Sequence, residues 1–184
     1  MPADSRERMV RAAVALFRER GYAATSFHDV LDRSEAPRGS IYHHFPGGKE
    51  QLATEALRWY AGRVASALAG QSAADTVALF VTSSRDALVA SDYSSGCAVA
   101  AVALDQEPAL DAVVAEAFTG WRQALATTFT RDGATTAQAR RLASLVVAAV
   151  EGALMLARAE RSPQPLDDIA RELRSHLDTV LPGR

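Results

Sequence analysis

Cysteine is almost absent from the sequence, since Cys97 is the single one among 184 residues. An internal disulfide and a multi-cysteine metal site are therefore excluded. A lone cysteine followed by an apolar run is typical of a small buried hydrophobic residue, and we expect that role for Cys97. We expect no metal ion and no organic cofactor.

A strong charge of either sign is also lacking, because the net charge is −2. This excludes a protein that is basic over its whole surface. Up to and including Lys49 the chain has 8 basic and 6 acidic residues, against 12 and 16 after it. The weak positive excess therefore lies in the N-terminal part, which favours that part as a site for an anionic partner.

The sequence has no apolar run that we judge long enough to span a membrane. Its charged N-terminal stretch, residues 5–20, has the pattern of an amphipathic helix and lacks the cleavage region of a signal peptide. We therefore expect a cytoplasmic protein without a membrane partner.

Glycine and proline are few and clustered, and β-branched runs are short, whereas alanine is abundant and 48% of residues are hydrophobic. This composition predicts an all-α fold with a substantial core. Apolar spacing, capping residues and breaks predict nine helices. They cover residues 5–20, 27–33, 37–45, 49–69, 77–88, 97–104, 108–129, 135–156 and 166–181.

The stretch 26–49 has the pattern of two short helices joined by a turn. In the first, Phe27, Val30 and Leu31 form one narrow apolar stripe, and Ser26 with Asp29 predicts a capping box. Pro37 fits the first position of the second helix. That helix has only Ile41 and Phe45 as apolar anchors, one turn apart, so its other faces are polar and suited to a DNA groove.

The segment up to Lys49 resembles the TetR family of bacterial one-component repressors. The resemblance rests on Phe17, Gly21-Tyr22, Thr25 and the string 39–45, Gly-Ser-Ile-Tyr-His-His-Phe, followed by Lys49. Residues 36–40, 46–49 and 96–97 resemble the LmrA/YxaF-like, or lincomycin-resistance-regulator, branch. The resemblance implies a nine-helix TetR-type fold with a helix-turn-helix DNA-binding domain at 1–48. Residues 49–184 would form a ligand-binding and dimerisation domain, with the helix from about residue 49 linking the two.

The resemblance also implies a repressor that binds a palindromic operator in double-stranded DNA as a homodimer and is released by a small molecule. One residue departs from the family pattern, because Glu35 stands where a glycine is usual between the two short helices. If the turn requires a left-handed backbone, this costs on the order of 1 kcal/mol. A carboxylate near phosphate would further weaken DNA binding.

Phosphate contacts follow from residue type and supply most of the affinity of such a complex. Arg38 and Lys49 are expected to neutralise phosphates, and the hydroxyls of Thr25 and Ser26 to donate hydrogen bonds to them. The resemblance adds a phosphate contact by Tyr42.

Base contacts supply the specificity. Gly39 lets the duplex approach the backbone closely, and Ser40 and His43 are the expected readers of base edges. His44 contacts the DNA backbone or positions the turn. The alternative is that Tyr42 and one histidine only pack against neighbouring helices.

Dimerisation is expected through the last two helices, which are apolar on more than one side and have small residues that permit close approach. The alternative is that these faces only complete the monomer core. The residues expected at the dimer interface are Leu142, Leu145, Val146, Ala149, Gly152, Ala153, Leu156, Ile169, Leu173 and Leu177.

An effector pocket is expected among the central helices, as is usual for small-molecule sites in helical bundles. Few charged residues fall on the inward faces, so we expect an apolar or aromatic effector without an ionic anchor. The candidate lining residues are Trp59, Phe80, Leu88, Val99, Leu104, Phe118, Trp121, Leu125 and Met155.

Two other classes of function are an enzyme and a small-molecule-binding protein. An enzyme is disfavoured, because the sequence has no phosphate loop, nucleophile elbow or His-Glu helix motif. The adjacent His43 and His44 cannot both face one metal from a regular helix, since neighbours point about 100° apart. The remaining alternative is a TetR-fold small-molecule-binding protein that does not act through DNA.

Overall fold

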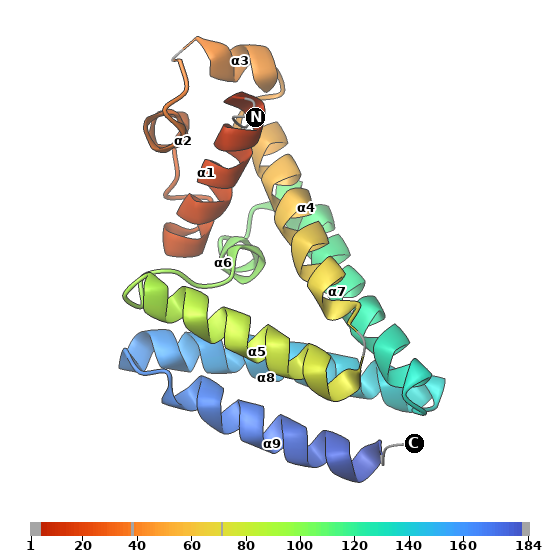
Figure 1. Cartoon of the computed structure of the whole chain (residues 1–184). Coiled ribbons are helices and arrows are strands. Elements are labelled where there is room, and N and C mark those ends of the chain that lie inside the picture. The colour runs from red at the N-terminus through yellow and green to blue at the C-terminus, as the bar shows by residue number, and fades with distance from the viewer. Residues whose placement is uncertain (1–4, 38, 71, 182–184) are drawn as a thin grey trace. The chain divides into compact units, whose positions relative to one another are not determined.

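The computed structural model describes residues 5–37, 39–70 and 72–181. Within these ranges the chain forms nine α-helices and one short 3-10 helix, η1, with no strand, which confirms the all-α prediction (Figure 1). The elements are α1 Ser5–Arg20, α2 Phe27–Ser34, α3 Ser40–His44, α4 Gly48–Leu68, α5 Ala73–Ala90, α6 Ala98–Leu104, η1 Pro108–Leu110, α7 Asp111–Arg131, α8 Thr136–Glu160 and α9 Gln164–Val180.

Two proline positions differ from the prediction. Helix α3 begins at Ser40, so Pro37 precedes the helix instead of opening it. The reason is a turn, in which the Pro37 carbonyl accepts a hydrogen bond from the Ser40 N–H at 2.9 Å. Pro108 opens the 3-10 helix η1, and α7 follows at Asp111.

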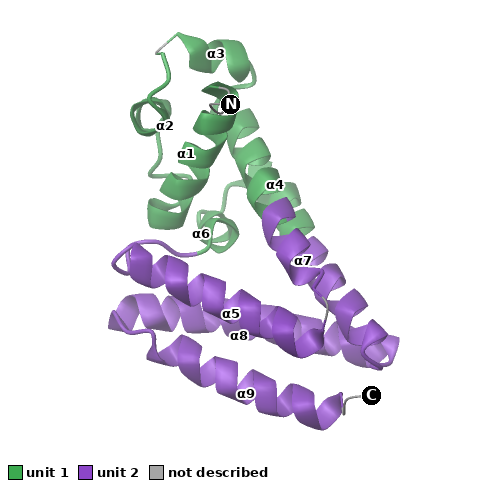
Figure 2. Ribbon diagram, viewed as in Figure 1, with its two compact units in different colours: residues 1–61, 97–117 green, residues 62–96, 118–184 purple. Residues whose placement is uncertain are grey.

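The chain divides into two compact units (Figure 2). Unit 1 comprises Met1–Ala61 and Cys97–Ala117, and unit 2 comprises Gly62–Gly96 and Phe118–Arg184. Helices α4 and α7 each contribute residues to both units. Unit 1 therefore holds more than the predicted DNA-binding segment 1–48, because it also contains the start of α4, all of α6 and the start of α7.

In unit 1, α1 packs against α2, α3 and α6. Its apolar stripe is buried, with Met9 and Phe17 at 0 and 1% exposure. Ile41 and Phe45, the two predicted anchors of α3, are completely buried. A short helix with so few internal hydrogen bonds is marginal alone, so these two side chains hold α3 in place.

In unit 2, α5, α8 and α9 pack against one another pairwise, with α9 in contact with both of the others (Figure 1). The C-terminal half of α7 supplies Trp121, Leu125 and Phe129 to the core, each at most 1% exposed. An ion pair of 2.8 Å between Arg85 Nε and Asp167 Oδ1 joins α5 to α9.

Helix α8 is long and apolar enough to cross a membrane by length and composition alone, which corrects the expectation that no segment reaches that threshold. Of its most apolar 18-residue window, 44% is buried inside the protein. A helix that packs in a protein core passes the same test, so this property alone does not indicate a membrane segment.

Candidate nucleic-acid interface

The turn between α2 and α3 follows the sequence prediction closely. Ser26 caps α2 and forms a capping box with Asp29, in which each side chain accepts a hydrogen bond from the other residue's backbone N–H. The helix ends at Glu35, whose φ of 52° and ψ of 35° are left-handed. The condition under which Glu35 costs energy is therefore met, because its backbone is left-handed and a side chain there is strained.

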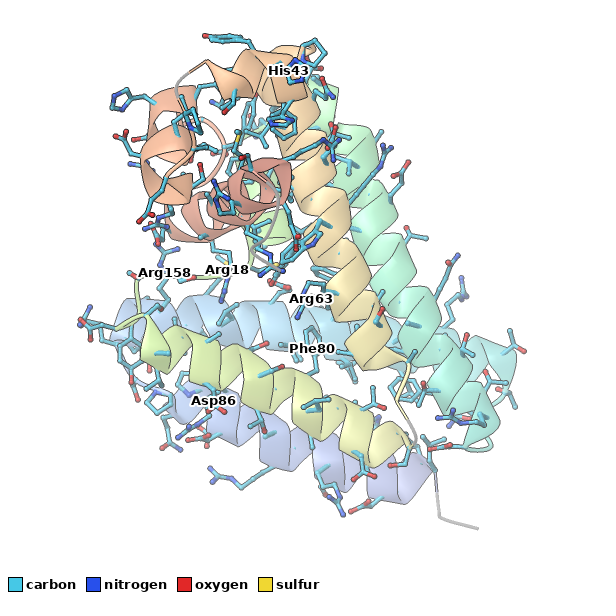
Figure 3. The ribbon with its side chains drawn as sticks, turned by 45° about the horizontal axis from the view of Figure 1, so that its top comes forward. Arg18, His43, Arg63, Phe80, Asp86 and Arg158 are labelled. Carbon is cyan, nitrogen blue, oxygen red and sulfur yellow. The ribbon has the colours of Figure 1, made fainter. Side chains whose placement is uncertain are left out.

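The outer face of α3 carries two exposed aromatic rings. Tyr42 is 68% exposed, and its ring meets the half-buried ring of Phe27 edge to face, with centroids 5.6 Å apart. His43 is also exposed, and Figure 3 shows it on α3. His44 is half-buried, with its ring 5.4 Å from that of His43. Tyr42 and His43 are therefore presented to solvent rather than packed into the core.

Gly39 and Ser40 lie at the start of α3. Gly39 has φ −77° and ψ −13°, which every residue adopts readily, and a Cβ added there would meet no atom within 4 Å. Nothing in the described structure thus requires a glycine at this position. The Ser40 hydroxyl donates to the Pro37 carbonyl at 2.6 Å, so towards a base edge it would act as an acceptor.

The hydroxyls of Thr25 and Ser26 are engaged within the protein. Thr25 is 2% exposed and donates to the Gly21 carbonyl at 2.7 Å, so the prediction that this hydroxyl faces phosphate is corrected. Ser26 is exposed, but its Oγ donates to Asp29 Oδ2 at 2.6 Å. That bond, with the Ser26 backbone N–H and Arg20, lowers the pKa of Asp29 to about 2.

Lys49 and Arg38 are the cations predicted to meet phosphate, and Arg38 lies outside the described residues. Lys49 is half-buried, with its ammonium 3.9 Å from the centroid of the Tyr22 ring. Burial lowers the pKa of Lys49, while the charges of Asp105, Glu107 and Asp29 oppose that shift. The ammonium therefore lies on an aromatic face, and the charges of three carboxylates act on it.

Several arginines of unit 1 form exposed ion pairs with acidic side chains. Arg20 pairs with Asp29 at 3.0 Å, and Arg33 pairs with Glu19 at 2.6 Å. Arg6 pairs with Glu55. Such pairs contribute little stability, but they compensate positive charge beside the candidate interface. This agrees with the small excess of basic over acidic residues in the part of the sequence up to Lys49.

The ten residues predicted at the dimer interface fall into two sets. Half of them are buried in the core of unit 2, namely Leu142, Val146, Ala153, Leu173 and Leu177. The others are exposed or half-buried, namely Leu145, Ala149, Gly152, Leu156 and Ile169. A groove of about 330 Å³ between α8 and α9 includes Leu145 in its wall.

The residues predicted for the effector pocket are also divided. Leu104 and Met155 are 71 and 60% exposed, so their side chains face solvent rather than the interior, which corrects the prediction for both. Three are half-buried, namely Trp59, Phe80 (Figure 3) and Phe118. Four are core residues at most 1% exposed, namely Leu88, Val99, Trp121 and Leu125. A groove of about 660 Å³ between α5 and α9 is lined by none of the nine.

One contact in unit 1 was not foreseen from the sequence. Asp105, directly after α6, accepts hydrogen bonds from the backbone N–H groups of Tyr22 and Ala23. The partners are 83 and 82 residues apart, so no local pattern reveals them. No group of three or more metal-binding side chains occurs in the described ranges, and Cys97 is buried.

Comparison with known families matches both parts of the chain. Residues 9–56 match the model of bacterial regulatory proteins of the tetR family. Residues 73–172 match the C-terminal domain of LmrA/YxaF-like transcriptional regulators. The second match covers more than half of the chain.

Relatives extend over nearly the whole length. An uncharacterized HTH-type transcriptional regulator of Mycobacterium tuberculosis is 40% identical over 189 aligned positions, covering 97% of each chain. The HTH-type transcriptional regulator YxaF of Bacillus subtilis is 32% identical, covering 92% of this chain and 93% of its own.

Solved structures share the fold. A TetR transcriptional regulator of Legionella pneumophila has a TM-score of 0.83 and 24% identity, covering 96% of this chain and 99% of its own. The regulator CifR, solved with 26-base-pair operator DNA, has a TM-score of 0.73 and 24% identity, covering 95 and 97%. The chain is therefore a DNA-binding transcriptional regulator of the TetR family with an LmrA/YxaF-like C-terminal domain.

Proposed function

We propose that this regulator is a repressor that binds a palindromic operator as a homodimer and is released by a small apolar or aromatic effector. In this proposal residues 1–48 contact DNA, and 49–184 serve dimerisation and effector binding. The observation that carries the proposal is α3, which buries Ile41 and Phe45 completely and presents Tyr42 and His43 outward. The solved complex of the structurally similar CifR with operator DNA supports the same use of this fold.

The residues proposed to contact DNA differ in whether their polar side-chain groups are already used in hydrogen bonds within the protein. Tyr42, His43 and Lys49 keep polar groups that can face DNA, and Ser40 keeps an acceptor. Ser26 serves first as the α2 cap, so we give it a secondary role. We retain Arg38 and His44 as phosphate contacts on residue type.

Dimerisation is supported by an apolar stripe on the exposed side of α8. At 100° per residue, Leu145, Ala149, Gly152 and Leu156 fall within about 60° of one another around the helix. Leu145 and Leu156 are 46 and 56% exposed, so this stripe is left without cover in the single chain. Gly152 would let a second helix approach closely, since a Cβ there meets no atom within 4 Å.

The dimer has a direct test in sedimentation velocity at micromolar concentration. We expect a dimer for the wild type and a monomer for Leu145→Glu, because the charge would be buried without a partner. Leu79→Glu is the matched control, since Leu79 is 54% exposed on α5 and lies outside the stripe. A wild-type monomer, or a dimer that Leu145→Glu leaves intact, would contradict the proposed interface.

The decisive experiment for DNA binding is an unbiased selection of duplexes from a random-sequence pool. We expect enrichment of two inverted half-sites spaced by about one helical turn or a multiple of it. Enrichment of a single asymmetric site would refute the palindrome, and no enrichment at low salt would refute sequence-specific binding. The enriched duplex then serves to screen small molecules for release, and release only by polyanions would refute an apolar effector.

A further inference from the structure

Asp105 holds the turn that follows α1. Its Oδ2 accepts hydrogen bonds from the backbone N–H of Tyr22 at 2.5 Å and of Ala23 at 3.1 Å. Both amides lie beyond the last residue of α1, and both donate to the same carboxylate oxygen. Hydrogen bonds to an ionised carboxylate are stronger than neutral ones, so this contact restrains the turn.

Gly21 makes the contact possible. Its φ is +79°, and a Cβ at this position would lie 2.7 Å from Asp105 Oδ2 and 3.0 Å from Oδ1. Any other residue would therefore displace the carboxylate as well as strain the backbone. Gly21 thus serves two purposes, as the left-handed residue that ends α1 and as the space into which the carboxylate fits.

The same turn determines where Lys49 lies. Tyr22, whose backbone N–H donates to Asp105, has its ring centroid 3.9 Å from the Lys49 ammonium. A cation at this distance over an aromatic face is attracted by the ring. The Tyr22 ring itself is placed edge-on against Phe17, with centroids 6.0 Å apart. The position of the ammonium therefore depends on a turn that is held from α6.

We propose that Asp105 is a positioning residue for DNA binding, because it fixes the Tyr22 turn and thereby the direction in which Lys49 presents its charge. This inference rests on the proposed contact between Lys49 and phosphate. It assigns a DNA-binding role to a residue of the segment 97–117, which lies far along the chain from the helix-turn-helix.

Two variants separate positioning from simple charge. Asp105→Asn keeps the size and one acceptor oxygen but removes the charge that strengthens both hydrogen bonds, and Asp105→Glu keeps the charge and displaces the carboxylate. If Asp105 acted only as a negative charge near DNA, Asp105→Asn would tighten binding and Asp105→Glu would change nothing. If it positions Lys49, both variants weaken binding.

The measurement is the affinity for the enriched duplex by fluorescence anisotropy over a range of salt concentrations. A lost phosphate contact makes the slope of log K against log salt shallower by about 0.9 per protomer. We expect Lys49→Ala and both Asp105 variants to show this change, with at least about a tenfold loss of affinity at low salt. In the Lys49→Ala background the Asp105 variants should have no further effect on the slope.

Glu107→Gln is the matched control, because Glu107 also acts on Lys49 by its charge and should leave affinity equal to or above that of the wild type. Circular dichroism at the assay temperature checks that each variant is folded. Partial unfolding of the DNA-binding segment would lower the active fraction without changing the slope, and that result would overturn the inference.

The outcomes also distinguish the inference from the function on which it rests. If Lys49→Ala makes the slope shallower but the Asp105 variants do not, Asp105 has no positioning role. If the wild type binds the duplex and Lys49→Ala leaves the slope unchanged, the proposed phosphate contact of Lys49 is refuted while DNA binding stands. If the wild type binds no duplex, the proposed function itself is refuted.

Discussion

Replacing Gly39 by alanine should raise the stability of the folded protein and lower its affinity for DNA. Gly39 has right-handed helical angles, and a Cβ there would meet no protein atom within 4 Å. The folded protein therefore accepts alanine without strain, while the unfolded chain loses conformational freedom. The variant should be more stable by about 0.4–1 kcal/mol.

DNA binding should change in the opposite direction. In the proposed complex the backbone at the start of α3 approaches the duplex, and a methyl group would hold it away. The loss of one charge-assisted contact per half-site costs about 1.5–3 kcal/mol. Two half-sites then give at least about a hundredfold weaker binding by the dimer.

Thermal denaturation and fluorescence anisotropy with the enriched duplex measure the two effects side by side. Gly62→Ala is the control, because Gly62 is exposed in the middle of α4 and also has open space around its Cα. It should gain about 1 kcal/mol of stability with unchanged DNA binding. If Gly39→Ala bound DNA as tightly as the wild type, the proposed approach of the backbone to DNA would be refuted.

Three further substitutions test the local structure around α2. Because the pKa of Asp29 is lowered to about 2 by its bonds to Ser26, its stabilising effect is complete above about pH 4 and is lost as the pH falls through 2. Asp29→Asn should therefore lower the melting temperature much more at pH 6 than at pH 2, and an equal loss at both would contradict the capping box. Thr25→Val should cost about 1 kcal/mol in urea denaturation by removing the hydrogen bond to Gly21, with an unchanged salt slope of DNA binding, whereas a shallower slope would restore Thr25 as a phosphate contact. Glu35→Gly should stabilise the protein by about 1 kcal/mol and tighten DNA binding, and a loss of either property would show that the Glu35 side chain is needed.

The sequence predicts most of the helical architecture, because local signals are enough for it. Apolar spacing and the cap at Ser26 locate α1 and α2. The left-handed backbone at Glu35 is raised only as a condition, because the family resemblance places a glycine there. The start of α3 is missed because Pro37 is equally suited to a turn, which is what the structure contains.

The candidate site is predicted less completely, since side-chain partners depend on tertiary contacts. Residue type does not reveal that the Thr25 hydroxyl is turned inward, that the Lys49 ammonium lies on Tyr22, or that Asp105 holds the turn. Exposure likewise separates Leu104 from the buried members of the predicted pocket, which periodicity in a short apolar helix cannot do.

The left-handed Glu35 also bears on how this regulator can evolve. Glutamate and glycine codons differ by a single base, so one point mutation removes both the backbone strain at residue 35 and the carboxylate between α2 and α3. If the protein is the repressor proposed above, tighter operator binding is one nucleotide away. In that case a lineage that keeps glutamate here binds its operator more weakly, and less effector is needed to release it.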